Sequence, residues 1–328
     1  MSEKPAALDL ERSTIEEVKR AIEERFPPPE TEIQALERDA RAGIRDLATH
    51  IRKRLRAETR ERARLENMAT LENKLRDRGI FSIAGVDEAG RGPLAGPVVA
   101  AAVILPAGTL IPGLNDSKKL SETRREALYK QIQEIALACA VGESSPLEID
   151  EMNIRNATHL AMRRALAGLS CRPDKVIVDG NALPGSPNSE LAIVGGDRKS
   201  ISIAAASIIA KVTRDRIMVQ EDRNYPEYGF SGHKGYGSAE HLKALIKYGA
   251  SPIHRRSFAG VPGWDHPLSE DFQVFADGIT AARDMDELAA MGHSVASAAE
   301  NLPNQEIQML REIYSRRREV LLRFFFPL

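Results

Sequence analysis

The sequence predicts an α/β domain, in which helices cover a β-sheet, with helical extensions at both ends of the chain. In the middle part, short apolar segments of strand length alternate with longer segments of helical composition, and this alternation is typical of layered α/β domains. The four apolar segments are residues 81–86, 98–105, 175–178 and 191–194. The sequence on either side is almost entirely helix-forming. We therefore expect three parts: a charged helical arm over 1–78, the α/β domain over 79–262 and a helical extension over 263–328.

The arm over 1–78 is rich in Glu and Arg. Ser13 and Glu16 have the spacing of a capping box at the start of a helix, and Pro27-Pro28-Pro29 ends that helix. From Thr31 onward, apolar residues recur at steps of three and four, as on one face of a helix: Ile33, Leu36, Ala40, Ile44, Leu47, Ile51 and Leu55. This pattern predicts either one long amphipathic helix or a helical pair.

The α/β domain begins abruptly at Ile80. Its first two strands, 81–86 and 98–105, are separated by a turn rich in Gly and Pro. A helix is predicted from Ser121, which is a suitable N-cap, to about Ala140, and another over 157–169.

Two further strands end at acidic turns. The strand over 175–178 stops at Asp179-Gly180-Asn181, and the strand over 191–194 stops at Gly195-Gly196-Asp197. The segment from Ser202 to about Arg223 is rich in Ala and Ile and contains neither Gly nor Pro, which predicts a long buried helix.

The composition excludes several classes of protein. The 46 basic and 47 acidic residues nearly cancel, so the net charge neither requires nor excludes a polyanionic partner. Cys139 and Cys171 have no second ligand at metal-binding spacing, and no apolar run approaches the ~20 residues of a membrane span. We expect a reduced, cytoplasmic protein without a membrane partner. In the tail, helices are predicted over 286–299 and 305–323, followed by a small apolar patch at 324–328.

Acidic residues follow two of the predicted strands. Asp87 and Glu88 are adjacent carboxylates at a strand end, where a charge beside the core is costly unless it is paired or bound to metal. An acidic turn with no function would have the same sequence. Asp179 also ends a strand, however, and open α/β sheets bind ligands outside the carboxyl ends of their strands. Converging carboxylates favour Mg²⁺ or Mn²⁺, whereas His233 and His254 lack the spacing of a zinc site.

The fourth acidic ligand is ambiguous in the sequence. Asp215, on the long buried helix, is the preferred candidate, and a surface pair with Lys211 one turn earlier is its alternative interpretation. Asp197 is the main competitor, but an N-cap role for the following helix is the better interpretation of that residue.

Several blocks in this order resemble the signatures of bacterial ribonuclease HII, a type 2 ribonuclease H. The opening block is the segment from Asp87 to Val99, DEAGRGPLAGPVV. The others are Asp116-Ser117-Lys118-Lys119-Leu120, Val178-Asp179-Gly180-Asn181, Gly196-Asp197 to Lys211-Val212-Thr213-Arg214-Asp215-Arg216, Gly232-His233-Lys234-Gly235-Tyr236-Gly237 and His254-Arg255-Arg256-Ser257-Phe258. The resemblance covers about residues 80 to 260.

The resemblance implies a ribonuclease H-like fold with a five-stranded mixed sheet. It also implies metal-dependent hydrolysis of the RNA strand of RNA–DNA hybrids, and of DNA with embedded ribonucleotides, giving 5′-phosphate and 3′-hydroxyl ends. Asp87, Glu88, Asp179 and Asp215 then match the active-site carboxylates. Gly90-Arg91-Gly92 matches the turn whose backbone senses the ribose 2′-hydroxyl, and Tyr236 matches the aromatic residue that stacks on the next, deoxy sugar.

Further polar residues are candidates for contacts with backbone phosphates: Ser117, Lys118, Lys119, Lys234, Arg255 and Arg256. Each of them equally fits an ordinary surface charge. Loop packing is the alternative for Tyr236, but the flanking glycines, which free it for stacking, favour the functional interpretation. The arm either grips the duplex or packs on the domain. The tail fits a dimer contact, a docking surface for a protein partner or a passive helix pair.

Two rival functions remain to be weighed. An inactive nucleic-acid-binding or assembly protein is disfavoured because all four candidate carboxylates are acids. A DNA-directed nuclease or an integrase-like enzyme on the same fold is disfavoured by the Gly-Arg-Gly turn with its downstream Tyr, because such an enzyme does not need to sense a 2′-hydroxyl.

Overall fold

The computed structural model describes residues 13–262, 269–299, 302 and 304–325. The chain forms two compact units, Met1–Met68 with Leu110–Gly113, and Ala69–Thr109 with Leu114–Leu328. Among the described residues, none of the helices is both long enough and apolar enough to cross a lipid bilayer.

From residue 13 onward, where the structure describes it, the first unit contains three helices, α1 (Ile15–Glu24), α2 (Glu30–Glu37) and α3 (Ala42–Met68). The predicted stripe is broken between α2 and α3, so the helical-pair alternative is the correct one. The helices bury a small apolar core of Val18, Ile22, Ile33, Leu36, Ile44, Ala48 and Ile51. The capping box of α1 is Thr14 with Glu17, one residue later than predicted, because Thr14 is the residue with extended backbone before the first turn.

The second unit begins at α4 (Thr70–Arg76), so the boundary between the units lies before the one predicted after residue 78. The physical reason is Glu72, whose side chain is fully buried. Its carboxylate accepts hydrogen bonds from the Ser200 hydroxyl at 2.6 Å and from the Ser202 amide at 3.0 Å. A carboxylate is stabilised at a helix N-terminus, and Glu72 therefore fixes α4 to the helix that starts at Ile201.

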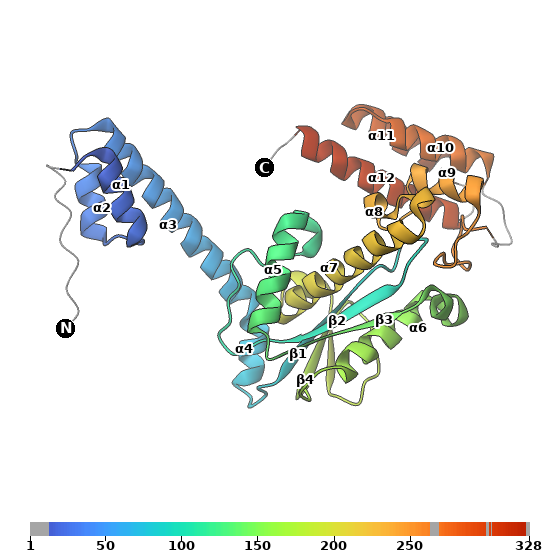
Figure 1. Ribbon diagram of the computed structural model, residues 1–328, viewed down its shortest axis with the longest axis horizontal. Helices are drawn as coiled ribbons and strands as arrows, with labels where there is room; N and C mark the ends of the chain where they lie inside the picture. Colours follow the sequence, from blue (N-terminus) through green and yellow to red (C-terminus); the bar gives the residue numbers. More distant parts are fainter. Residues whose placement is uncertain (1–12, 263–268, 300–301, 303, 326–328) are drawn as a thin grey trace. The chain divides into compact units, whose positions relative to one another are not determined.

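The centre of the second unit is a five-stranded mixed sheet with the order β3-β2-β1-β4-β5 (Figure 1). Its strands are β1 (Ile83–Ala89), β2 (Val98–Ile104), β3 (Ala138–Ser144), β4 (Lys175–Asp179) and β5 (Glu190–Ile193). β1, β2 and β3 pair antiparallel, whereas β1, β4 and β5 pair parallel. The predicted α/β class and the five-stranded mixed sheet are thus confirmed.

A long helix packs on each face of the sheet. α7 (Ile201–Asn224) packs on β1 and β2, and α6 (Pro146–Ala167) packs on β1, β2 and β3. In Figure 1 the two helices lie on opposite sides of the strands. α5 (Glu122–Ile135) packs on α7. The core between the sheet and α6 is made of small and β-branched residues, including Val86, Val98 and Val178.

Two expectations for this unit are wrong. The helix predicted to reach Ala140 ends at Ile135, and β3 follows it, because Ala138–Ser144 pairs with β2 along its whole length. The helix predicted over 157–169 starts at Pro146. It contains a kink at Asn153, where φ is 71°, and the Asn153 side chain accepts a hydrogen bond from the Asn156 amide and restarts the helix.

The described residues of the tail form three helices, α10 (Glu270–Ala281), α11 (Met285–Ala298) and α12 (Asn304–Phe325), of which the first was not predicted. They share one apolar cluster with Phe230 of α8 (Phe230–His233) and with α9 (Ala239–Tyr248). The tail is therefore part of the second unit. Of the predicted apolar patch, residues 326–328 lie outside the described residues.

Candidate active site

Asp87 and Asp179 lie at the same level on adjacent parallel strands. β1 and β4 pair with Val86 opposite Val178, so the next residue along each strand is an aspartate. Alternate residues of a strand face the same side of the sheet, and the residue two positions before each aspartate packs against α7. The two carboxylates therefore share the face of the sheet that α7 covers.

Burial and like charge both act on this site. Asp87 is only 6% exposed, and its carboxylate accepts hydrogen bonds from the Ser207 hydroxyl and, at 2.8 Å, from the Glu88 amide. Burial, followed by the charges of Glu88 and Asp179, raises the pKa of Asp87 well above its usual range. Burial also raises the pKa of Glu88, while Arg91, at 3.3 Å, lowers it. Such a group of carboxylates is stabilised by a proton or a cation.

Asp197 belongs to the same group of charges. The Gly196 amide donates to the Asp179 carboxylate at 2.6 Å, and Asp197 follows in the short helix η2 (Gly196–Arg198). Burial raises the pKa of Asp197, and the charges of Asp116 and Asp179 raise it further. The N-cap role expected for Asp197 is wrong, because Ser200 is the N-cap of α7.

Asp215 has different neighbours. Its carboxylate lies 2.7 Å from the Lys211 ammonium and 3.9 Å from the Arg125 guanidinium. Asp215 is not among the groups that most strongly shift the pKa values of Asp87, Glu88 and Asp197. The structure thus brings Asp87, Glu88, Asp179 and Asp197 together and gives Asp215 the ion pair with Lys211 that was its alternative interpretation.

The donor atoms of this group fit a hard divalent cation, since all are carboxylate oxygens. The burial of several like charges at one end of the sheet also fits a cation. Within the described part of the chain, no three His, Cys, Asp or Glu side chains already form a closed ligand set.

A glycine turn adjoins the carboxylates. Gly90 has a φ of 93°, and a β-carbon there would lie 1.9 Å from the Arg214 Nε. The Arg255 guanidinium donates to the carbonyls of Gly90 at 2.6 Å, Arg91 at 2.9 Å and Gly96 at 2.9 Å. Arg255 is 0% exposed, so the phosphate contact expected for it is wrong: its charge is used to hold the turn.

Three segments distant in the sequence are hydrogen-bonded around this turn. The Leu94 amide donates to the Gly235 carbonyl at 2.8 Å, and the Gly96 amide donates to the Ile253 carbonyl at 2.8 Å. Arg214 donates to the carbonyl of Lys234 at 3.0 Å, and its guanidinium lies 5.8 Å from the centre of the Tyr236 ring. Tyr236 is half-buried and is therefore held close to the glycine turn.

Comparisons with known proteins agree with this arrangement. The family model for ribonuclease HII matches residues 84–261, and the model for the ribonuclease HII N-terminal domain matches residues 14–76. Ribonuclease HII from Desulfitobacterium hafniense (strain DSM 10664 / DCB-2) is 50% identical over 252 residues, which are 77% of this chain and 96% of that protein. Ribonuclease HII from Clostridioides difficile (strain 630) is 50% identical over 76% of this chain and 98% of its own.

The chain belongs to the ribonuclease HII family. It is therefore an endoribonuclease of the ribonuclease H class, a hydrolase, and the resemblance noted in its sequence is confirmed. Among solved structures, ribonuclease H2 from Pyrococcus horikoshii OT3 is 31% identical, covers 56% of this chain and 96% of its own, and has a TM-score of 0.48.

The remaining phosphate-contact candidates of this ribonuclease HII differ in exposure. Lys118, Lys119 and Arg256 are exposed. Lys234 is half-buried, and its ammonium group donates to the Ser231 carbonyl. Ser117 is buried, and its hydroxyl shares a 3.0 Å hydrogen bond with that of Ser207.

Sequence reasoning missed two supporting residues of the ribonuclease HII site, Ser207 and Arg214, and assigned a third, Arg255, to a phosphate contact. Ser207 links Asp87 to Ser117, and the two arginines hold main-chain carbonyls of the turn and its neighbours. Their only signal in the sequence is that they lie within the matching blocks, since no local pattern distinguishes a buried arginine from an exposed one.

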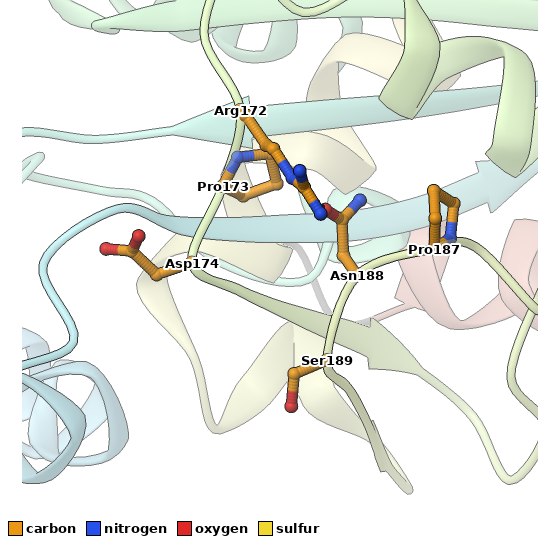
Figure 2. Close-up of a pocket in the computed structure, with 6 residues that line it drawn as sticks. All are labelled: Arg172, Pro173, Asp174, Pro187, Asn188 and Ser189. Atoms are coloured by element: carbon orange, nitrogen blue, oxygen red, sulfur yellow. The ribbon is translucent and has the colours of Figure 1, made fainter.

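The cavity in Figure 2, of about 360 Å³, lies elsewhere on the sheet. Its lining includes Asp174, immediately before β4, and Ser189, immediately before β5. Figure 2 shows the side chains of Arg172 and Asn188 directed toward each other. Because β4 and β5 are parallel, this cavity is at the end of the strands opposite to Asp179. The cluster of acidic residues at the other end of the strands, Asp87, Glu88, Asp179 and Asp197, is the better candidate for the ribonuclease HII active site.

Proposed function

We propose that this protein cuts the RNA strand of RNA–DNA hybrids and also cuts on the 5′ side of ribonucleotides embedded in duplex DNA, leaving 5′-phosphate and 3′-hydroxyl ends. The observation that supports this best is the group of carboxylates at the ends of β1 and β4, directly beside the glycine turn. Membership of the ribonuclease HII family supports the substrate class.

The metal ligands in this proposal are Asp87, Glu88, Asp179 and Asp197. Two divalent cations, Mg²⁺ or Mn²⁺, supply activation of water and stabilisation of the departing 3′-oxygen when bound. Asp197 replaces Asp215 in this set, because burial and the charges of Asp116 and Asp179 raise the pKa of Asp197, while Asp215 is paired with Lys211. The carboxylates would hold the cations, and Ser207 orients Asp87 through a hydrogen bond.

Substrate selection is assigned to the turn and the loop beside it. In the proposal, the backbone of Gly90-Arg91-Gly92 senses the ribose 2′-hydroxyl, the group that distinguishes RNA from DNA at a given site. Tyr236 stacks on the following deoxy sugar, which its place near the turn supports. Lys118, Lys119, Arg256 and Lys234 contact phosphates, so binding weakens steeply as salt concentration rises.

A cleavage assay tests this function. An end-labelled duplex with one ribonucleotide is incubated with the full chain and Mg²⁺ or Mn²⁺, beside an all-DNA duplex of the same sequence and an Asp87→Asn variant. We expect one cut, 5′ of the ribonucleotide, and none in the all-DNA duplex or with the variant. Equal cutting of the all-DNA duplex contradicts the proposed specificity, and unchanged cutting by Asp87→Asn contradicts the proposed site.

A further inference from the structure

Two buried histidines and a serine lie behind the Tyr236 loop. His241, on α9, and His254 are 0% and 2% exposed, and their Nε2 atoms are 2.9 Å apart. His254 Nδ1 lies 2.9 Å from the Ser251 amide nitrogen and 2.7 Å from the Ser251 hydroxyl. His241 Nδ1 lies 2.8 Å from the main-chain carbonyl oxygen of Tyr236. These contacts form a continuous chain from Ser251 to Tyr236.

The hydrogen-bonding capacities of the end groups determine the direction of this chain. An amide donates, so His254 Nδ1 accepts from Ser251, and the Nε2 of a neutral His254 must then carry the proton. At the other end a carbonyl only accepts, so His241 Nδ1 carries a proton and its Nε2 accepts. The two constraints agree: His254 donates to His241, and His241 donates to Tyr236. Burial lowers the pKa of His254 to about 4, consistent with a neutral ring.

The main chain of the loop that receives this hydrogen bond is also held by neighbouring groups: the Tyr236 carbonyl accepts from the Ser238 amide at 2.8 Å, and the Tyr236 amide donates to the His233 carbonyl at 3.0 Å. Tyr236 is flanked by Gly235 and Gly237, which have no side chains to pack. Gly235 has a φ of 80°, and a β-carbon there would lie 2.5 Å from the Ala95 carbonyl oxygen. The position of the loop therefore depends on hydrogen bonds to its main chain, and the one from His241 ties the Tyr236 carbonyl to a side chain of α9.

We infer that Ser251, His254 and His241 form a hydrogen-bonded relay that fixes the main chain at Tyr236, and that both histidines are positioning residues for recognition of the sugar next to the ribonucleotide. This inference rests on the proposed function, in which the Tyr236 ring contacts that sugar. The histidines act through Tyr236 and do not contact the substrate.

Two isosteric variants separate the halves of the relay. The side-chain amide of His241→Asn replaces the Nδ1 donor to Tyr236, whereas that of His241→Gln reaches the Nε2 position and leaves the Tyr236 carbonyl without this donor. On the single-ribonucleotide duplex, we expect kcat/KM to fall about tenfold in His241→Gln, chiefly through KM, which corresponds to loss of one hydrogen bond. We expect His241→Asn to stay within about threefold of wild type.

A double-mutant cycle with Tyr236→Ala distinguishes positioning from general stabilisation. If His241 acts through the Tyr236 ring, His241→Gln has no further effect on kcat/KM once that ring is removed. A tenfold loss in both backgrounds, or equal losses in the Asn and Gln variants, overturns the inference. Should His241→Gln fail to fold, His254→Asn takes its place in the same cycle with Tyr236→Ala. This variant keeps the acceptor for Ser251 but loses the donor to His241. Absence of cutting by the wild type would instead refute the proposed function.

Discussion

Replacing Gly90 by alanine tests why the turn beside the carboxylates requires glycine. Alanine at a φ of 93° costs about 1–2 kcal/mol from backbone strain alone. The new β-carbon would also lie 1.9 Å from the Arg214 Nε, so the guanidinium must move. Arg214 donates to the carbonyls of Ala95, Pro97 and Lys234. Loss of two such charged hydrogen bonds adds about 3–6 kcal/mol. We expect the free energy of unfolding to fall by about 4–8 kcal/mol in total.

Gly108→Ala is the matched control. Gly108 has a φ of 74°, but no atom lies within 4 Å of its missing β-carbon, so only the strain of about 1–2 kcal/mol applies. Urea unfolding monitored by circular dichroism measures both variants, and cleavage of the single-ribonucleotide duplex measures the effect on the turn. Gly90→Ala should also lose selectivity for the ribonucleotide, whereas Gly108→Ala should keep it. Equal losses of stability in the two variants would refute the account of Arg214.

Three further predictions concern the charged and buried groups. Asp197→Asn should lower kcat at least about 100-fold, since it removes a proposed metal ligand, whereas the kcat of Asp215→Asn should stay within about tenfold of wild type. Single-turnover cleavage measures both variants. A larger loss in Asp215→Asn than in Asp197→Asn would restore Asp215 as the ligand. In metal-free protein at pH 8, Asp87→Asn should increase the free energy of unfolding, because burial and the charges of Glu88 and Asp179 destabilise the ionised Asp87; a decrease in urea unfolding would contradict this. The pKa of His254 is about 4 in the folded protein, below the ordinary value of 6.5, so the unfolded chain binds more protons between these values. The contribution of the neutral His254 to the free energy of unfolding should therefore be complete above pH 6.5 and fall by about 3 kcal/mol as the pH is lowered toward 4. Urea unfolding of a His254→Asn variant would not show this loss.

The sequence predicted the convergence of Asp87 and Asp179 because it depends on local features. Each aspartate ends a β-branched or apolar run, and the ends of parallel strands meet at one edge of a sheet. The same reasoning failed for β3. Its residues, Ala138 to Ser144, include Ala, Gly and Glu and have little intrinsic strand preference, and it is the pairing with β2 that makes them a strand.

The choice between Asp197 and Asp215 needed the tertiary structure. The spacing of Lys211 and Asp215 shows that they share a helix face, but not which way that face points. The position of Asp197 beside Asp179 follows from a hydrogen bond between Gly196 and Asp179, which joins residues far apart in the sequence. The phosphate contact predicted for Arg255 was wrong for a related reason. A guanidinium can be buried only where other segments bring carbonyl groups to it, as Gly90 and Gly96 do here.

A crystal structure of the full chain with Mn²⁺ and a duplex containing one ribonucleotide would test the central claim most directly, with hydrolysis blocked by Ca²⁺ in a parallel crystal. Anomalous scattering locates the manganese without reference to the protein coordinates. We predict anomalous peaks among Asp87, Glu88, Asp179 and Asp197, with the ribose against the turn at Gly90. Peaks at another place on the surface, or a ribonucleotide bound away from this turn, would contradict the account.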